Sequence, residues 1–395
     1  MNGEATLSRA LNAAADRWYA VPGYPVTGIA DACRAEITVN EKVALEYALG
    51  DSLSGRRAAV IMKNVGLNAC ADTLVAAAVE GTRAGVVILA GDDEEVSGSQ
   101  HAQDSRCYGK VAGVPVFSPR PDEFGEAVET AFRASEMFSR PAILRIASGM
   151  LTRPAGGVPL ERKGIKKPRP DDRGLTMRGR SEAAEYRRME MCIWASSSAP
   201  RYITYPPKVG SESGCTTIDI SGDPPQTVHT RGYARTFCHD CPFLPVLGLM
   251  REREILPVCD IGCAVLAKNP PYSLCAASYS LGSSPAVAAT STGTALTGDY
   301  ALLHSGINAL IDIAEKERDL LLVVLANGTM GMTGGQRTPD ILPYLSWADP
   351  IVCAADDIAR IEEQLLSEKA SRKGLRIICI VGECPPGAHH ETVEC

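Results

Sequence analysis

The residues best suited to cofactor chemistry in this sequence are Asp299 and Asn327, which stand 28 positions apart. Asp299 follows Gly298 after an apolar segment, 292–297, and Asn327 follows a second one, 319–326. This separation is the length of one strand–helix–strand crossover. Both residues are therefore expected at the carboxyl ends of neighbouring parallel strands, where such sheets bind ligands. Their oxygen atoms suit Mg²⁺, which shares its coordination shell with phosphates, and Gly298 would let a diphosphate approach the backbone closely.

Cysteines are the second feature that can do chemistry, because five of the fourteen fall between positions 238 and 275. Cys238 and Cys241 form a CxxC, Cys263 follows 22 residues later, and Cys384 comes after the apolar segment 375–381. Four thiolates hold a cubane iron–sulfur cluster. The same residues suit zinc, and a CxxC is also a redox dithiol, so the residues alone leave three possibilities open.

Length and composition indicate a globular protein of two or three domains. The 395 residues are 45% hydrophobic and carry a net charge of −7, which provides no electrostatic footprint for nucleic acid. No apolar run has the roughly 18 residues of a membrane helix. The N-terminus lacks a basic patch followed by an apolar stretch, so we expect a cytoplasmic protein in which seven disulfides would not persist.

Apolar segments alternate with helix-like segments in two parts of the chain, and this alternation predicts α/β domains with parallel sheets. In residues 1–150 the predicted strands are 56–63, 83–90, 113–117 and 141–147, and the predicted helices are 42–54, 68–82 and 122–138. In residues 236–395 the predicted strands are 254–258, 292–297, 319–326 and 375–381, and the predicted helices are 278–290, 303–316 and 355–369.

The part between them, 151–235, has a different composition. Segment 161–188 holds ten of the forty Lys and Arg residues, and Pro, Gly and Ser are frequent. This composition favours a solvated linker, with a small strand pair near 201–220. The predicted organisation is thus 1–150, a linker over 151–235, and 236–395.

Several motifs resemble one known family. GDYALLHSGINALIDIA and LANGTMGMTGGQ resemble the diphosphate-binding domain of the thiamine diphosphate-dependent 2-oxoacid:ferredoxin oxidoreductases. GYPVTGIAD, VNEKVALE, MKNVGLNACAD and QDSRCYGK resemble, in order, the pyrimidine-binding domain of the same family. The likeness is greatest to the large (alpha) subunit of the indolepyruvate oxidoreductases. It covers about 1–150 and 235–384, most of the chain.

The resemblance implies a thiamine diphosphate site with Mg²⁺ held by Asp299, Asn327 and the Thr329 carbonyl. The residues that would bind the cofactor are Gly298, Asp299, Asn327, Thr329, Gly331, Met332 and Thr333, with Gly334 closing the turn.

The resemblance also implies the residues that act on the substrate. Glu41 falls on the catalytic glutamate that bonds the aminopyrimidine N1′ and favours ylid formation. Thr27 falls on a hydroxyl that contacts the 2-oxo acid, and Arg106 on the arginine that binds its carboxylate. Asn68 is expected in the same cleft with Lys63 and Asn64, His304 is expected to donate a proton near the reacting carbon, and Glu46 is expected to be an exposed helix acid.

For the cysteines, the resemblance implies a proximal [4Fe-4S] cluster on Cys238, Cys241, Cys263 and Cys384, with Cys259 and Cys395 as substitutes for the fourth ligand. Two departures from the family are visible. His239 and Asp240 stand inside the CxxC where Pro-Gly is usual, and no C-terminal ferredoxin-like cysteine runs follow. Electrons would therefore leave through another chain, unless the oxidative half-reaction has been lost.

The expected function is oxidative decarboxylation of a 2-oxo acid, with an aryl pyruvate as the family's preference and coenzyme A as acyl acceptor. Electrons would pass through the cluster to ferredoxin or to a small beta-type subunit, in a homodimer or heterotetramer without nucleic acid or membrane. Two alternatives stay open. One is a non-oxidative decarboxylase of an anionic acid such as sulfopyruvate, and the other is a non-catalytic, cofactor-bearing subunit.

Overall fold

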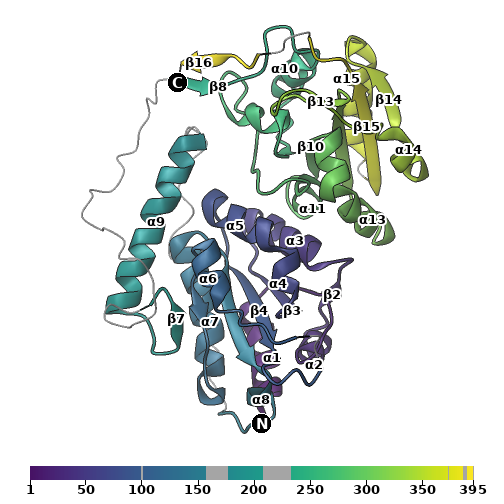
Figure 1. Ribbon diagram of the computed structural model, residues 1–395. Coiled ribbons are helices and arrows are strands. Elements are labelled where there is room, and N and C mark those ends of the chain that lie inside the picture. The colour runs from purple at the N-terminus through teal and green to yellow at the C-terminus, as the bar shows by residue number, and fades with distance from the viewer. Residues whose placement is uncertain (99–100, 157–176, 208–232, 372, 386–388, 395) are drawn as a thin grey trace. The chain divides into compact units, whose positions relative to one another are not determined.

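A computed structural model describes residues 1–98, 101–156, 177–207, 233–371, 373–385 and 389–394. The chain divides into two compact units (Figure 1). Unit 1 comprises Met1–Pro170 and Ser181–Gln226, and unit 2 comprises Asp171–Arg180 and Thr227–Cys395. Within the described part of the chain, none of the helices combines the length and apolar character needed to cross a membrane.

Unit 1 is built on a seven-stranded sheet in the order β2-β1-β3-β4-β6-β5-β7. Every pairing is parallel except that of β5 with β7. The strands are β1 Arg17–Ala20, β2 Glu36–Ile37, β3 Ala58–Lys63, β4 Val86–Asp92, β5 Val116–Phe117, β6 Ala142–Ala147 and β7 Ile203–Tyr205. β3 and β4 are apolar and almost fully buried because helices cover both faces of a parallel sheet.

The helices of unit 1 are α1 Gly3–Ala14, α2 Thr27–Ala32, α3 Glu41–Leu53, α4 Gly66–Ala69, α5 Ala71–Glu80, α6 Cys107–Ala112, the 3₁₀ turn Pro121–Glu123, α7 Phe124–Phe138, α8 Ser148–Leu151 and α9 Met177–Ser197. Helix α3 packs on β1 and β3, and α7 packs on β4 and β6. The Asn40 side chain accepts a hydrogen bond of 2.9 Å from the Val43 N–H, and this cap fixes where α3 begins.

Helix α9 and β7 overturn part of the linker prediction. Residues 177–197 form a helix whose Met191 and Ala195 are fully buried, rather than a solvated connector. The Trp194 ring packs against Phe138 at 5.4 Å and against Phe117 at 6.3 Å, which attaches α9 to unit 1. The segment was predicted as a linker because its many Lys and Arg residues outweigh the few apolar residues that are buried. β7 lies where a strand pair was predicted, and 208–220 lies outside the described residues.

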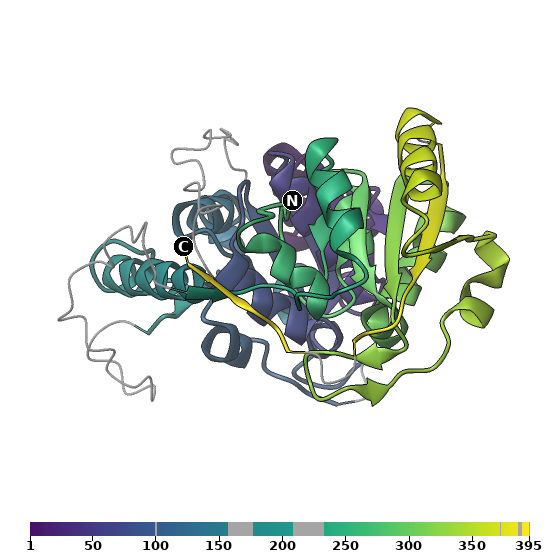
Figure 2. The same cartoon turned by 90° about the horizontal axis from the view of Figure 1, so that it is seen from above.

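Unit 2 contains a five-stranded parallel sheet in the order β14-β15-β11-β10-β9. Its strands are β9 Val258–Cys259, β10 Thr294–Gly298, β11 Leu320–Ala326, β14 Ile351–Ala354 and β15 Leu375–Val381. Two small antiparallel pairs accompany it. They are β12 Thr329–Met330 with β13 Gln336–Arg337, and β8 Tyr233–Arg235 with β16 Thr392–Glu394, the latter side by side in Figures 1 and 2.

The helices of unit 2 are α10 Leu244–Glu252, the 3₁₀ turn Cys263–Lys268, α11 Ser284–Ala289, α12 Asp299–Ala301, the π turn Leu302–Gly306, α13 Ile307–Glu315, α14 Leu342–Leu345, the 3₁₀ turn Ser346–Ala348 and α15 Ile358–Ser371. The predicted helix 278–290 is shorter than expected. It begins at Ser284, with Pro285 in its first turn, because 280–283 form a turn held by side-chain hydrogen bonds.

Candidate active site

The carboxyl ends of β9, β10, β11 and β15 open into one cavity of unit 2 with a volume of about 410 Å³. Its lining is mostly apolar and contains predicted residues of both kinds, those for the diphosphate and those for the cluster. The predicted residues that line it are Cys238, Cys241, Cys263, Gly298, Asp299, Asn327, Thr329, Gly331, Met332, Thr333 and Cys384. A parallel sheet therefore brings together residues up to 146 positions apart, from 238 to 384.

Asp299 is a buried carboxylate that joins the ends of two strands. Its Oδ2 accepts hydrogen bonds from the Gly328 N–H at 2.8 Å and from the Thr338 hydroxyl at 3.3 Å. Its Oδ1 accepts from the Tyr300 N–H at 2.7 Å. Burial raises the pKa of Asp299 in spite of these donors. A cation bound at this position would favour the ionised carboxylate.

The turn after β11 carries oxygen atoms suited to a metal-bound diphosphate. The Thr329 hydroxyl is buried and has no hydrogen-bond partner among the described residues. The Asn327 carboxamide accepts from the Thr329 N–H at 3.4 Å, and its Nδ2 donates to the Cys384 sulfur at 3.1 Å. An unsatisfied buried hydroxyl beside a buried carboxylate fits a polar ligand here. The residues present therefore fit Mg²⁺ and a diphosphate group.

The four predicted cluster cysteines face the same cavity. A Cβ on Gly331 would lie 3.4 Å from the Cys263 sulfur and 3.8 Å from that of Cys384, so the diphosphate turn borders the cysteines. Burial and the neighbouring thiols raise the pKa of Cys263 to about 12 and that of Cys241 to about 11. Among the described residues, no three His, Cys, Asp or Glu side chains converge as ligands of one metal ion.

The structure describes one of the two cysteines that were predicted as substitute cluster ligands. Cys259 is buried in β9 and does not line the cavity. Its thiol interacts with that of Cys275, whose sulfur donates to the Ala277 carbonyl at 3.0 Å. Cys395 lies outside the described residues. Of the cysteines that the structure describes, Cys107 in α6 is the exposed one.

Asp260 is a buried residue beside the cavity lining that the sequence did not indicate, and it does not itself line the cavity. Its fully buried carboxylate accepts hydrogen bonds from the Gly282 N–H (2.6 Å), the Ser284 hydroxyl (2.9 Å), the Thr297 hydroxyl (2.9 Å) and the Ile261 N–H (3.1 Å). These donors come from three segments: the turn that carries Cys263, the 280–284 turn and the end of β10. A single Asp after a short strand gave no sequence signal for this role.

Replacing Asp260 with alanine is expected to lower the thermal midpoint of the protein by about 4–8 °C. Four buried donors would lose their acceptor, and even partial loss costs about 2 kcal/mol. Differential scanning calorimetry measures the shift. Asp319→Ala is the matched control, because exposed Asp319 accepts one hydrogen bond, from the Gly374 N–H at 2.8 Å. Equal midpoints for the two variants would contradict this role.

In unit 1, Glu41 is the first residue of α3 and lies against α4. A Cβ on Gly66 would stand 2.7 Å from the Glu41 Cγ and 2.8 Å from its Oε1, closer than real contacts allow. Gly66 therefore leaves the space that the carboxyl group of Glu41 occupies. Asn40 caps the first turn of α3, in which Glu41 is the first residue. The cap fixes the backbone of Glu41, and Gly66 leaves the space for its carboxyl group.

Gly66→Ala is expected to reduce kcat by at least about tenfold with little loss of stability. The new methyl group must displace the Glu41 carboxyl, and misplacement of about 1 Å can cost 100-fold. Alanine is otherwise favoured over glycine in a helix. Steady-state kinetics and the thermal midpoint separate the two effects. Gly149→Ala, in α8 with no atom near the added Cβ, is the control; an unchanged kcat for Gly66→Ala would refute the close packing.

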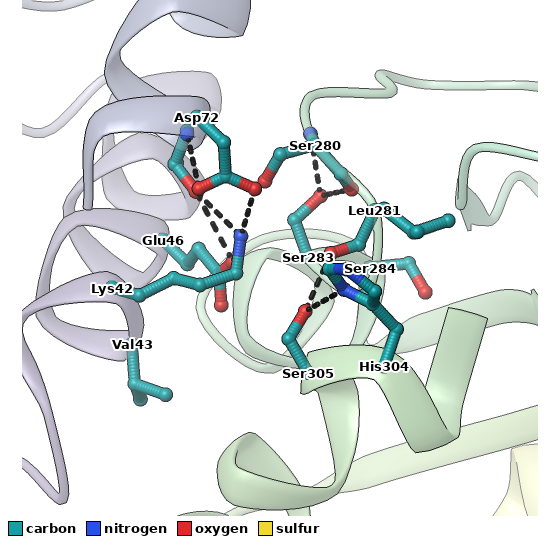
Figure 3. A network of polar contacts seen from close by, with 12 residues as sticks. Lys42, Val43, Glu46, Asp72, Ser280, Leu281, Ser283, Ser284, His304 and Ser305 are labelled. Atoms are coloured by element: carbon teal, nitrogen blue, oxygen red, sulfur yellow. Dashed lines mark hydrogen bonds and ion pairs between the residues drawn. The ribbon is translucent and has the colours of Figure 1, made fainter. Parts of the chain in front are cut away.

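A partly buried ion-pair network lies on α3 just after Glu41. It corrects the prediction that Glu46 is exposed. Glu46 is 1% exposed, and Lys42 lies 3.3 Å from its carboxylate and 2.8 Å from that of Asp72 (Figure 3). Lys42 also donates to the Thr73 hydroxyl at 3.0 Å. The two carboxylates raise the pKa of Lys42 against the effect of burial. Glu46 therefore joins α3 to α5 instead of facing solvent.

Other predicted residues of unit 1 follow the carboxyl ends of its parallel strands. Asn64 and Asn68 hold Gln103 through hydrogen bonds of 2.9 to 3.2 Å, and Tyr108 donates to the Asn68 carboxamide. This links the turn after β3 to the loop after β4. Thr27 begins α2 and is exposed. Lys63 ends β3 and packs where a Cβ on Gly23 would stand.

Arg106, the predicted carboxylate-binding residue, pairs with an acidic side chain close to it in sequence. Its guanidinium forms hydrogen bonds of 2.7 to 3.0 Å with the Asp104 carboxylate, and this partner raises the pKa of Arg106 and lowers that of Asp104. About half of the side chain remains exposed. A substrate carboxylate would therefore compete with Asp104 or share the guanidinium with it.

His304 is exposed on the π turn that follows α12 and does not line the cavity of unit 2. Its Nδ1 lies 3.4 Å from the Ser305 hydroxyl, which donates to the Leu281 carbonyl at 2.6 Å (Figure 3). Its ring stacks obliquely near Tyr300. A role in proton transfer stays a prediction.

Comparison with known proteins shows which proteins this chain resembles. A family profile described as "Thiamine pyrophosphate enzyme, C-terminal TPP binding domain" matches residues 260–348, the segment with Asp299 and Asn327. The indolepyruvate oxidoreductase subunit IorA of Methanothermobacter thermautotrophicus is 26% identical, over 86% of this chain and 76% of that relative. The chain is thus similar to this IorA over most of its length, and its diphosphate segment matches a thiamine pyrophosphate-binding domain.

Other relatives and solved structures agree with this relationship. The IorA of Archaeoglobus fulgidus is 41% identical over 159 residues, which is 37% of this chain and 26% of that protein. A thiamin diphosphate-dependent enzyme from Mycobacterium smegmatis shares the fold with a TM-score of 0.63, at 14% identity, over 98% of this chain and 100% of that one. A 4-hydroxybenzoylformate decarboxylase from Rhodococcus jostii gives a TM-score of 0.60, at 13% identity, over 97% of this chain and 99% of that one. The chain thus has the α/β fold of these thiamine diphosphate-dependent enzymes.

Proposed function

We propose that this IorA-related chain is an oxidoreductase that oxidatively decarboxylates a 2-oxo acid with thiamine diphosphate, Mg²⁺ and a [4Fe-4S] cluster. One observation carries the proposal. A single cavity collects Asp299, Asn327 and Thr329 together with Cys238, Cys241, Cys263 and Cys384. A non-oxidative decarboxylase has no use for four cysteines beside its diphosphate turn, so this proximity favours the oxidoreductase. The relationship to proteins named indolepyruvate oxidoreductase supports an aryl pyruvate as substrate.

The diphosphate end is argued from unit 2. Asp299, Asn327 and the Thr329 carbonyl would hold Mg²⁺, and the turn from Gly331 to Thr333 would bind the phosphate oxygens. The buried Asp299 carboxylate would offset the metal charge, and the orphan Thr329 hydroxyl would gain a partner. When bound, thiamine diphosphate supplies the electron sink that lets a 2-oxo acid lose carbon dioxide.

The acid–base and substrate roles belong to unit 1. The Glu41 carboxyl would hold and release a proton toward the aminopyrimidine ring, and Gly66 keeps it in position. Arg106 would bind the substrate carboxylate, with Thr27 and Asn68 orienting the 2-oxo group. His304 of unit 2 would supply a proton to the product.

The thiols of Cys238, Cys241, Cys263 and Cys384 would ligate the cluster as thiolates. Burial raises the pKa of Cys263 to about 12, and binding to iron would reverse the cost of ionisation. Cys238 and Cys241 flank His239, which is about 80% exposed, so this end of the site is close to solvent. A ferredoxin or a small partner subunit would take up electrons there, and coenzyme A would accept the acyl group.

Anaerobic purification followed by iron, sulfide and thiamine analysis tests the proposal. We expect a brown protein with about four iron and four sulfide per chain and reduction of a viologen dye that depends on a 2-oxo acid. A colourless protein that decarboxylates without a dye would instead indicate the non-oxidative enzyme. A protein that binds no thiamine diphosphate would overturn both readings.

Asp299→Asn tests the diphosphate end separately. We expect the Mg²⁺-dependent affinity for thiamine diphosphate to fall by at least about tenfold, since even outer-shell partners of a metal ligand contribute 10- to 100-fold. Isothermal titration calorimetry measures the affinity without turnover. Asp340→Asn is the control, since exposed Asp340 lies outside the cavity. Unchanged affinity in Asp299→Asn would rule out the proposed metal ligand.

A further inference from the structure

The C-terminal strand of the described chain returns to the segment that carries the CxxC. β16 pairs with β8 in antiparallel fashion (Figure 2). In this register Thr392 lies opposite Arg235. Beyond the register, the Thr236 N–H donates to the Glu391 carbonyl at 2.8 Å, and the Glu391 N–H donates to the Phe237 carbonyl at 3.3 Å. These backbone bonds place His390, which precedes Glu391, beside Cys238, which follows Phe237.

His390 and Cys238 both line the cavity of unit 2. The Nε2 of His390 lies 3.5 Å from the Cys263 sulfur, a hydrogen-bonding distance for a sulfur acceptor. Its neighbour His389 is exposed and does not line the cavity. The contact joins two residues 127 positions apart, and no motif in the sequence indicates it.

We infer that His390 donates a hydrogen bond from Nε2 to the Cys263 thiolate and thereby raises the reduction potential of the cluster. This inference rests on the proposed function. One-electron reduction adds negative charge that spreads onto the cysteine sulfurs. A donor aimed at one sulfur therefore stabilises the reduced state more than the oxidised state, and hydrogen bonds to sulfur are a known control of cluster potential.

The position of His390 also explains why a histidine suits this site. The β8–β16 pairing and the backbone hydrogen bonds of Glu391 hold the chain next to His390, whose ring lies near the Cys263 sulfur. The surrounding lining is apolar, with Phe237, Phe243 and Ala264 in the same cavity wall. In such surroundings a hydrogen bond to a charged sulfur is stronger than it would be in water.

Redox titration of the anaerobic holoprotein, followed by electron paramagnetic resonance, tests the inference. His390→Leu is expected to change the ratio of reduced to oxidised cluster by about tenfold toward oxidised at a fixed potential, a shift of about 59 mV to more negative values. His390→Gln, which keeps an N–H donor, should recover part of the shift. His389→Leu should leave the potential unchanged.

The outcomes separate the inference from the proposed function. A wild-type protein without iron and sulfide would refute the cluster itself. A wild-type cluster whose potential is the same in His390→Leu would refute the hydrogen bond alone. Loss of one iron or of the cluster in both His390 variants would show that His390 is a ligand or a packing residue, which would also overturn the inference.

Discussion

Replacing Glu41 with glutamine is expected to lower kcat for 2-oxo acid-dependent dye reduction by roughly 100- to 10,000-fold, the usual contribution of a positioned acid–base group. Glutamine has nearly the same shape, so it should keep the packing against Gly66 and the start of α3. It cannot release a proton. The affinity for thiamine diphosphate should change far less than kcat. Stopped-flow kinetics and calorimetric titration measure the two quantities.

Glu95→Gln is the matched control for this variant, because Glu95 is an exposed loop residue of the same unit. It should retain wild-type kcat. If Glu41→Gln also retained it, Glu41 would not be the acid–base residue, and the catalytic role proposed for it would fail. A fall in kcat together with an equal loss of cofactor binding would point to a binding role instead.

Replacing Cys263 with alanine is expected to abolish the cluster. Iron content should fall from about four per chain to near zero, and viologen reduction should fall by at least about tenfold. Cys263 is chosen because its sulfur faces the cavity beside Gly331, Cys384 and His390. Chemical iron analysis and the visible absorbance of the anaerobic protein measure the loss directly, independently of turnover.

Two matched variants make the cysteine result specific. Cys107→Ala removes the exposed thiol of α6, and Cys259→Ala removes a buried thiol that does not line the cavity. Both should keep iron and dye reduction. Iron that survives in Cys263→Ala would mean that another set of ligands holds it. Equal loss in Cys259→Ala would mean that folding, rather than ligation, accounts for the effect.

Sequence patterns predicted the sheet strands that are buried on both faces, because such strands are continuous apolar runs. β11 and β15 begin and end within one residue of the predicted segments, and β3 and β6 differ by two residues or fewer. Strands β1, β2 and β14 were missed because they are short or partly exposed. Helix α9 was missed because its Lys and Arg residues outweigh the few apolar side chains that dock it.

The residues of the candidate site were likewise predictable only in part. Strand-end residues such as Asp299 could be placed from spacing alone, since parallel strands end at a common edge. Contacts that depend on tertiary packing could not be placed. Gly66 under Glu41, Asp260 between three segments and His390 beside Cys263 each join parts of the chain that no local pattern connects. The burial of Glu46 was mispredicted because Thr73, which donates to its carboxylate, and Asp72, which shares its partner Lys42, lie on another helix.

The exposure of Cys107 has a practical consequence for labelling. Alkylating reagents attack the thiolate, and burial raises the pKa of thiols such as Cys33 and Cys379 to about 12, which leaves them unreactive. Among the described cysteines, Cys107 is the most exposed, so iodoacetamide or a maleimide dye should modify it first. That thiol offers an attachment point for a fluorophore or spin label on unit 1 that avoids every residue assigned to the cavity of unit 2.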